Sequence, residues 1–187
     1  MSEASISRRR LIVVSAISAL SGLASGLAVA LGLRSTADLW GYLVLYLPGA
    51  LFALLVLLPL LKGVDMQVAR GLIIMLVSMA THYAAVRASV AVVEKPLFLL
   101  FIAFVGGVAA AIVSFCSAFL LRIRVRALPT LMAVLSGGLA GLAIGTPFTA
   151  HAAFSDTMEI VLITSGYVIW QIGVAISLAC EKDSPDT

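Results

Sequence analysis

The sequence predicts an all-α integral membrane protein built as a bundle of six transmembrane helices, with both termini in the cytoplasm. The first observation is composition: 62% of the residues are hydrophobic, only 11% are charged, and the mean hydropathy is +1.16. A soluble surface of this size needs many more charged side chains, whereas lipid accepts an apolar exterior. The second observation is segment length, and the third is the distribution of Lys and Arg.

Six apolar segments reach the roughly 20 residues that a helix needs to cross a bilayer. The predicted spans cover about 11–33, 40–61, 71–93, 97–121, 128–149 and 158–180. The first follows the basic stretch SRRR, the second contains Pro48 and Pro59, and an EKP turn separates the third from the fourth. The links are too short to fold on their own, so residues 1–187 are predicted to form a single transmembrane domain.

The basic residues alternate between the two sides of the predicted bundle. Of the 12 Lys and Arg residues, nine fall on one side: Arg8, Arg9, Arg10, Lys62, Arg70, Arg122, Arg124, Arg126 and Lys182. The positive-inside rule makes that side cytoplasmic and places both termini there. The expected location is therefore a cytoplasmic membrane, the inner membrane of a prokaryote.

An alternative interpretation concerns the start of the chain. The letters SRRRLI resemble a twin-arginine export signal, and AVA at 28–30 resembles a cleavage site. Cleavage there would leave five spans. The apolar run 11–33 is longer than the 7 to 15 residues usual for a signal peptide, which favours an uncleaved first span.

Small residues recur every fourth position in three of the spans. The glycines in these stripes are Gly22, Gly26, Gly107, Gly137, Gly141 and Gly145. Small residues on one helix face let two backbones approach closely in lipid, so we expect the first, fourth and fifth spans to pack together. The letters SGGLAG suggest a phosphate-binding loop, but a mid-span helix has no free amide groups to offer a phosphate.

The third span carries an unusual group of polar residues in the stretch THYAAVR. His82 falls near the bilayer midplane, and Arg87 lies about 7.5 Å closer to the outer surface. Arg87 can reach the interface by extending its side chain, can pair with an outer carboxylate, or can bind a ligand. Tyr83, four residues before Arg87, can stack beneath its guanidinium group.

His82 is too deep to reach water, so we expect it to face protein and form a hydrogen bond. One interpretation is an interhelical bond to Gln171, which lies at a similar depth in the sixth span. The other interpretation is a polar ligand site at mid-depth. Thr164, Tyr167 and Gln171 share one helix face and would line that site together with His82.

Several functional classes lack support in the sequence. No catalytic triad, paired carboxylates or nucleotide-binding motif is present, which argues against an enzyme. The two cysteines and two histidines have no metal-ligand spacing, so neither a metal nor another cofactor is predicted. The basic clusters lie at the ends of apolar runs, which indicates membrane topology and not nucleic-acid binding.

The leading hypothesis is a transport or permease component that binds a small solute between its helices. The alternative is a non-transporting accessory, assembly or immunity-type membrane subunit whose polar residues only join helices. Either protein would act within the lipid bilayer as a homo-oligomer or with a partner membrane subunit. The analogy with small permeases is one of shape, since no motif identifies a family.

Overall fold

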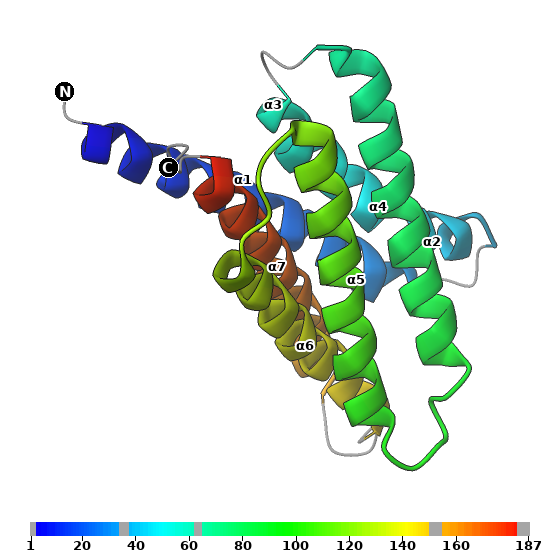
Figure 1. Ribbon diagram of the computed structural model, residues 1–187. Helices are drawn as coiled ribbons and strands as arrows, with labels where there is room; N and C mark the ends of the chain where they lie inside the picture. Colours follow the sequence, from blue (N-terminus) through cyan, green and yellow to red (C-terminus); the bar gives the residue numbers. More distant parts are fainter. Residues whose placement is uncertain (1–2, 34–37, 62–64, 150–154, 183–187) are drawn as a thin grey trace.

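The computed structural model describes residues 3–33, 38–61, 65–149 and 155–182. This part of the chain is helical apart from short turns. The helices are α1 (Glu3–Gly32), α2 (Asp38–Phe52), the π-helix η1 (Ala53–Leu57), α3 (Leu58–Leu60), α4 (Gln67–Val90), α5 (Phe98–Leu121), α6 (Ala127–Thr149) and α7 (Asp156–Lys182). The start of α1 and the end of α7 lie at the same end of the bundle (Figure 1).

Five helices in the described residues are long and apolar enough to cross a membrane: α4, α5, α6, and the parts of α1 and α7 that cover Arg9–Gly32 and Asp156–Cys180. Their outer surface is apolar, with Phe104 68% and Phe119 81% exposed. Lipid solvates such side chains without cost, whereas each would expose hydrocarbon to water in a soluble protein. The prediction of an all-helical fold is confirmed for the described residues, and the five long apolar helices are compatible with a multi-pass membrane protein.

The predicted span at 40–61 is helical but not uniform. It consists of α2, η1 and α3 in direct succession, and its apolar part, Val44–Leu60, is shorter than the other spans. Pro59 has no N–H to give to the carbonyl four residues earlier, and a π-turn is one way for a helix to absorb that missing bond. Whether this segment crosses the membrane stays a prediction.

The third predicted span differs at both ends, since α4 runs from Gln67 to Val90 and not from 71 to 93. Met66, directly before α4, adopts the left-handed conformation with φ of 56°. Polar Gln67 and Arg70 continue the helix beyond the apolar run because a helix end outside the hydrocarbon can carry polar side chains. The helix therefore begins about one turn before the apolar run that predicted the span.

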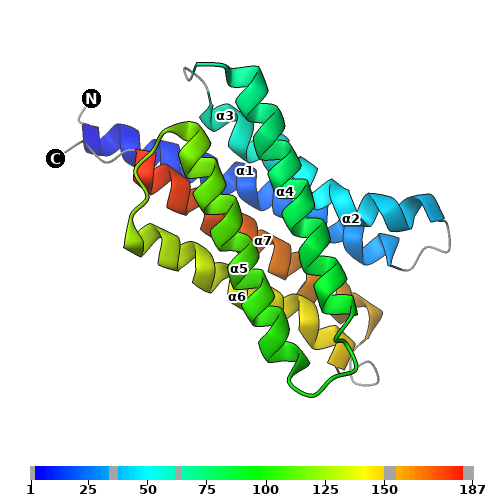
Figure 2. The same ribbon diagram turned by 45° about the vertical axis from the view of Figure 1, so that its right-hand side comes forward.

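The helices form a closed ring in which each packs against the next, in the order α1, α7, α6, α5, α4 and α2. Figures 1 and 2 show α1, α7 and α6 side by side, with α4 and α5 crossing them at a different slant. The ring has two ends. We call the end with the α4–α5 connection the Glu94 end, and the end with the α5–α6 connection the Arg122 end.

The two halves of the ring are filled differently. The half nearer the Arg122 end is solidly packed, and it contains most of the large side chains that are fully buried: Phe52, Leu57, Leu61, Ile74, Val113, Val174 and Leu178. Helices α5 and α7 are also in direct contact across the ring. The half nearer the Glu94 end contains fewer large buried side chains and leaves space along the ring axis.

Glycines make the closest contacts between helices. A Cβ atom on Gly106 would lie 2.2 Å from the carbonyl oxygen of Gly137, and one on Gly141 would lie 2.4 Å from that of Ile102. Such short distances show that no side chain fits between the α5 and α6 backbones at these glycines. The two backbones lie close enough for Cα–H···O contacts. Gly107 faces Val134 in the same interface. The fourth and fifth predicted spans therefore pack as expected from their small residues.

The stripe on α1 packs elsewhere. A Cβ atom on Gly22 would lie 2.6 Å from Cα of Val168, and one on Gly26 would lie 2.4 Å from Cα of Thr164. Both contacts are with α7, so the expected three-helix core of the first, fourth and fifth spans is wrong. The spacing of small residues identified the close-packing face of α1, but α7, which is the neighbour of α1 in the ring, covers that face.

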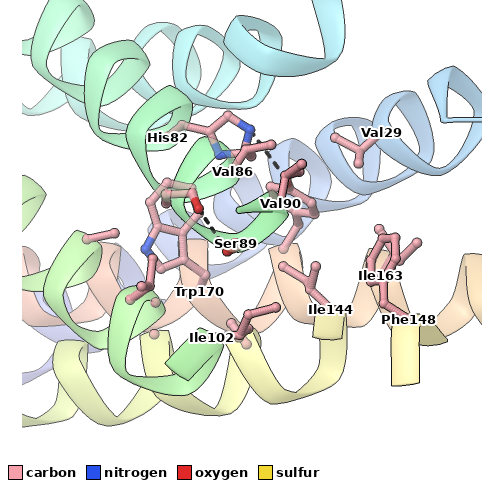
Figure 3. A pocket seen from close by; sticks show the side chains of 18 of the residues that line it. Val29, His82, Val86, Ser89, Val90, Ile102, Ile144, Phe148, Ile163 and Trp170 are labelled. Atoms are coloured by element: carbon pink, nitrogen blue, oxygen red, sulfur yellow. Dashed lines mark hydrogen bonds between the residues drawn. The ribbon is translucent and has the colours of Figure 1, made fainter. Parts of the chain in front are cut away.

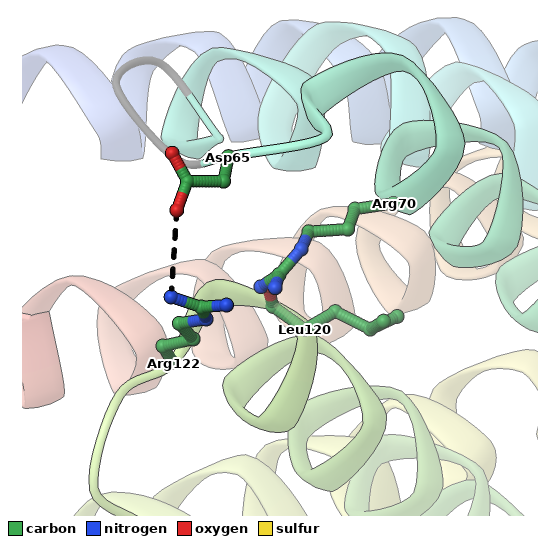
Figure 4. Close-up of polar contacts among 4 residues, drawn as sticks. All are labelled: Asp65, Arg70, Leu120 and Arg122. Atoms are coloured by element: carbon green, nitrogen blue, oxygen red, sulfur yellow. Dashed lines mark hydrogen bonds and ion pairs between the residues drawn. The ribbon is translucent and has the colours of Figure 1, made fainter.

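Polar contacts at the Arg122 end join α4 to α5 (Figure 4). Nη1 of Arg70 donates a hydrogen bond to the carbonyl oxygen of Leu120, in the last turn of α5. The last carbonyls of a helix lack partners within the helix, so this bond caps α5. Arg122 lies 3.6 Å from Asp65, but both side chains are exposed, and an exposed ion pair contributes little stability.

Candidate functional site

A cavity of about 300 Å³ occupies the ring axis in the half nearer the Glu94 end. All six members of the ring contribute to its wall, for example Val29 of α1, Val44 of α2 and Ile102 of α5. Figure 3 shows His82 and Trp170 toward one end of the cavity and Phe148 and Ile163 toward the other. The volume lies at the lower end of the range for small-molecule sites in proteins.

The cavity has a closed end and an open end. Trp170 lines the closed end, and its ring packs on Phe52 with the centroids 5.4 Å apart. Phe52 is fully buried, so the solid half of the ring begins directly behind Trp170. At the other end, the lining residues Leu33 and Val90 are 53% and 63% exposed. The cavity therefore reaches the surface between the ends of α1 and α4.

His82 projects from α4 into the closed end and is 6% exposed. The main chain of Val44 in α2 lies beside its ring. In a regular helix the Val44 carbonyl would accept the N–H of residue 48, but that residue is Pro48, which has no N–H. Neighbouring helices commonly satisfy such carbonyls inside a membrane. His82 is therefore placed where it can supply the donor that α2 lacks.

Tyr167 of α7 contacts the other side of the same ring. Its hydroxyl oxygen lies 3.4 Å from Nε2 of His82, and the two ring centroids are 5.6 Å apart. The contacts from Val44 to His82 to Tyr167 connect α2, α4 and α7 across the ring interior. Because an unpaired polar group in this environment is costly, the three helices hold one another in position at the depth of the cavity floor.

Gln171 and Thr164 lie outside the cavity, although they share a helix face with Tyr167. Nε2 of Gln171 donates a hydrogen bond to Oγ of Ser25 in α1, 3.0 Å away. The expected bond between His82 and Gln171 is therefore wrong, because Gln171 turns toward α1. Thr164 packs against Gly26 in the same α1–α7 interface. These two residues join helices, and only His82 and Tyr167 of the predicted polar group line the cavity.

Tyr83 and Arg87 are also separated from the cavity wall. Tyr83 stacks on Tyr46 of α2, with centroids 5.4 Å apart and planes 2° from parallel, so its expected position beneath Arg87 is wrong. Arg87 is exposed, and no carboxylate among the described side chains forms an ion pair with it. The side chain of Asp38, one of its predicted partners, lies outside the described part. His82, Tyr83 and Arg87 of the stretch THYAAVR thus lie in three different environments.

Sequence reasoning missed most of the cavity, because its wall is made of ordinary apolar residues from six helices. Among the lining residues that the structure describes, four have polar side-chain atoms: His82, Ser89, Tyr167 and Trp170. None of these described lining residues is charged. One signal was available in the sequence, since a mid-span proline frees the carbonyl four residues before it. Pro48 therefore marks Val44 as a carbonyl that needs a donor from another helix.

The described wall of the cavity is largely apolar and carries no charge. Within the described residues, no group of three or more His, Cys, Asp or Glu side chains could hold a metal ion, and His151 lies outside those residues. The titratable side chains of the described lining are His82 and Tyr167, and it contains no Lys or Arg to bind an anion. Comparison of the chain with family models, curated proteins and solved structures finds no match.

Proposed function

We propose that the protein is a membrane transport component that binds a small, largely apolar molecule in the cavity between its helices. The observation that carries this proposal is the asymmetric ring, hollow and open toward the Glu94 end and solid toward the Arg122 end. A transporter that exposes its binding site to one side of the membrane at a time is open at one end and closed at the other in each of its two states. The ring described above has the form of one such state. The apolar, uncharged wall supports a solute that partitions into lipid, taken up from the membrane or its surface.

The proposal includes a topology of six spans with both termini cytoplasmic, in a prokaryotic inner membrane. The described basic residues support it, because they concentrate at the Arg122 end: Arg9, Arg10, Arg70, Arg122, Arg124 and Arg126. The segment Asp38–Leu60 would form the second of the six spans, with the π-turn of η1 inside it. The cavity would then open to the outside of the cell. Transport by such a small ring would involve a second copy or a partner subunit.

Topology can be tested with single cysteines at the two ends, after Cys116 and Cys180 are replaced by serine. In intact cells, a membrane-impermeant maleimide should label Glu94→Cys and leave Val125→Cys unlabelled. Inside-out vesicles should give the opposite pattern. Both positions are exposed, so accessibility within the protein does not limit the reaction. Labelling of both sites in intact, sealed cells would contradict the six-span arrangement.

Cavity binding can be tested with the fluorescence of Trp170, which becomes the only tryptophan in a Trp40→Phe background. A bromoalkane that enters the cavity should quench Trp170 by contact. A cavity of 300 Å³ holds about ten non-hydrogen atoms if each takes the volume of a water molecule in the liquid, roughly 30 Å³. We therefore choose 1-bromooctane, which has close to that number of non-hydrogen atoms. Trp170 is otherwise shielded from lipid, since it is 7% exposed.

A matched pair of variants separates the cavity from the lipid surface. Ala85 lines the cavity, whereas the adjacent Ala84 is exposed on the outside of α4. Ala85→Phe should raise the 1-bromooctane concentration for half-maximal quenching about tenfold, and Ala84→Phe should leave it unchanged. Equal quenching of Trp170 in both variants would count against a binding cavity. It would favour the alternative function, an accessory or assembly subunit whose buried polar residues only join helices.

A further inference from the structure

The cavity is long and narrow. Its lining residues recur about once per helical turn along α5 from 98 to 109 and along α6 from 137 to 148. At 1.5 Å of rise per residue, each of these stretches is about 16 Å long. Spread over that length, a volume of 300 Å³ leaves a mean cross-section of about 18 Å². A single hydrocarbon chain has this width, whereas a ring system or a branched body is wider.

A second hollow adjoins the open end of the cavity, between the α4–α5 connection and the end of α6. The described walls of the two hollows have three residues in common: Val93, Phe98 and Phe148. Figure 3 shows Phe148 at the end of the cavity away from Trp170. The second hollow is lined by Glu94 and Lys95, and both side chains are exposed. From the closed end toward the surface, the described wall therefore changes from uncharged to one that carries charges of both signs.

We infer that the ligand of this cavity is a single-chain amphiphile, with its hydrocarbon tail in the cavity and its polar head in the second hollow beside Glu94 and Lys95. The tail has about ten carbons, the number of non-hydrogen atoms that 300 Å³ holds. The apolar wall favours the tail, whereas a polar head carried into the cavity would lose its hydration. This inference rests on the proposed function and names the class of molecule bound.

The orientation of the ligand can be tested by displacing 1-bromooctane from the Trp40→Phe protein in nanodiscs. Decylphosphocholine has one head, and 1,10-bis(phosphocholine)decane has the same head at both ends of the same chain. Both are used below the concentrations at which they form micelles, and protein-free nanodiscs give the partition of each into the bilayer. We expect the one-headed compound to restore the fluorescence of Trp170.

The two-headed compound should need an at least about hundredfold higher concentration in the bilayer. Its second head would be buried beside Trp170 without a counter-charge, which is costly. Displacement by both compounds at similar concentrations overturns the inference, because the closed end would then accept a charged head. Displacement by neither compound overturns it as well.

The position of the head can be tested by affinity labelling with N-decyl-2-bromoacetamide, from which a cysteine thiolate displaces bromide to form a thioether. Both native cysteines are first replaced by serine. Thr149→Cys then places a thiol in the second hollow, and Val125→Cys places one at the Arg122 end; both positions are exposed. N-ethyl-2-bromoacetamide, which lacks the tail, measures the intrinsic reactivity of each thiol.

After division by the ratio for the ethyl reagent, we expect the decyl reagent to label Thr149→Cys about tenfold faster than Val125→Cys, because binding holds the head beside the thiol. Adding Ala85→Phe should abolish this excess, and adding Ala84→Phe should preserve it. Equal normalised rates at the two positions, or an excess that survives Ala85→Phe, would contradict the placement of the head.

The two proposals fail in different ways. If 1-bromooctane quenches Trp170 and Ala85→Phe suppresses the quenching, the cavity binds small apolar molecules whatever the amphiphiles do. Failure of decylphosphocholine to displace the bromoalkane then refutes only the ligand class. If 1-bromooctane quenches the Ala84→Phe and Ala85→Phe proteins alike, the binding site itself is refuted, and the ligand class with it.

Discussion

Gly141→Ala is expected to lower the free energy of unfolding by about 1–3 kcal/mol, the usual cost of overpacking a tight interface. The added Cβ would lie 2.4 Å from the carbonyl oxygen and 2.9 Å from the carbonyl carbon of Ile102. All its close neighbours are backbone atoms, which cannot turn aside as a side chain can. Helix α6 must therefore move away from α5 along their shared interface. The larger Gly141→Leu change should prevent the two helices from packing at all.

Gly138 provides the control, because it lies in the same helix and a Cβ added there would have only one described atom nearby, the carbonyl oxygen of Ala103 at 3.5 Å. This is an ordinary contact distance. Gly138→Ala should be neutral or should stabilise the protein by about 0.5–1 kcal/mol, since alanine favours the helix. Unfolding in detergent, followed by circular dichroism, measures both changes. Similar stabilities for the two variants would mean that α5 and α6 are not in backbone contact.

The glycines also show how far sequence predicts this fold. The apolar runs located the helices, because a span of about 20 residues is required by the thickness of the bilayer. The four-residue spacing of small side chains located the faces that pack closely on α1, α5 and α6. It could not identify partners, because any small-residue face accepts any other of suitable shape. Gly22 and Gly26 pack on α7, whose contacting residues Thr164 and Val168 carry no such stripe.

The candidate site was predictable only in part. The depth of His82 required a buried hydrogen-bond partner, but depth does not give the rotation of one helix relative to another. Gln171 lies at a suitable depth and faces α1 instead. Tyr167 belongs to the same predicted helix face and lines the cavity with His82. The cavity itself could not be predicted, because it is space left between apolar side chains of six helices.

His82→Leu is expected to lower the free energy of unfolding by about 1–3 kcal/mol, because it leaves the Val44 carbonyl buried without a donor. Leucine has a similar volume, so loss of packing contributes less than loss of the hydrogen bond. His82→Asn keeps a donor at the same reach and should cost less than His82→Leu. The measurement is equilibrium unfolding in detergent micelles for both variants.

Pro48 supplies the decisive comparison, since the need for a donor at Val44 arises from this proline. In Pro48→Ala, the new N–H of residue 48 can bond the Val44 carbonyl within α2, and the carbonyl no longer depends on His82. His82→Leu should then cost about 1 kcal/mol less in the Pro48→Ala background than with Pro48 present. Additive effects, within about 0.5 kcal/mol, would show that the two residues act independently. The coupling would identify His82 as the donor that allows α2 to contain a proline in mid-span.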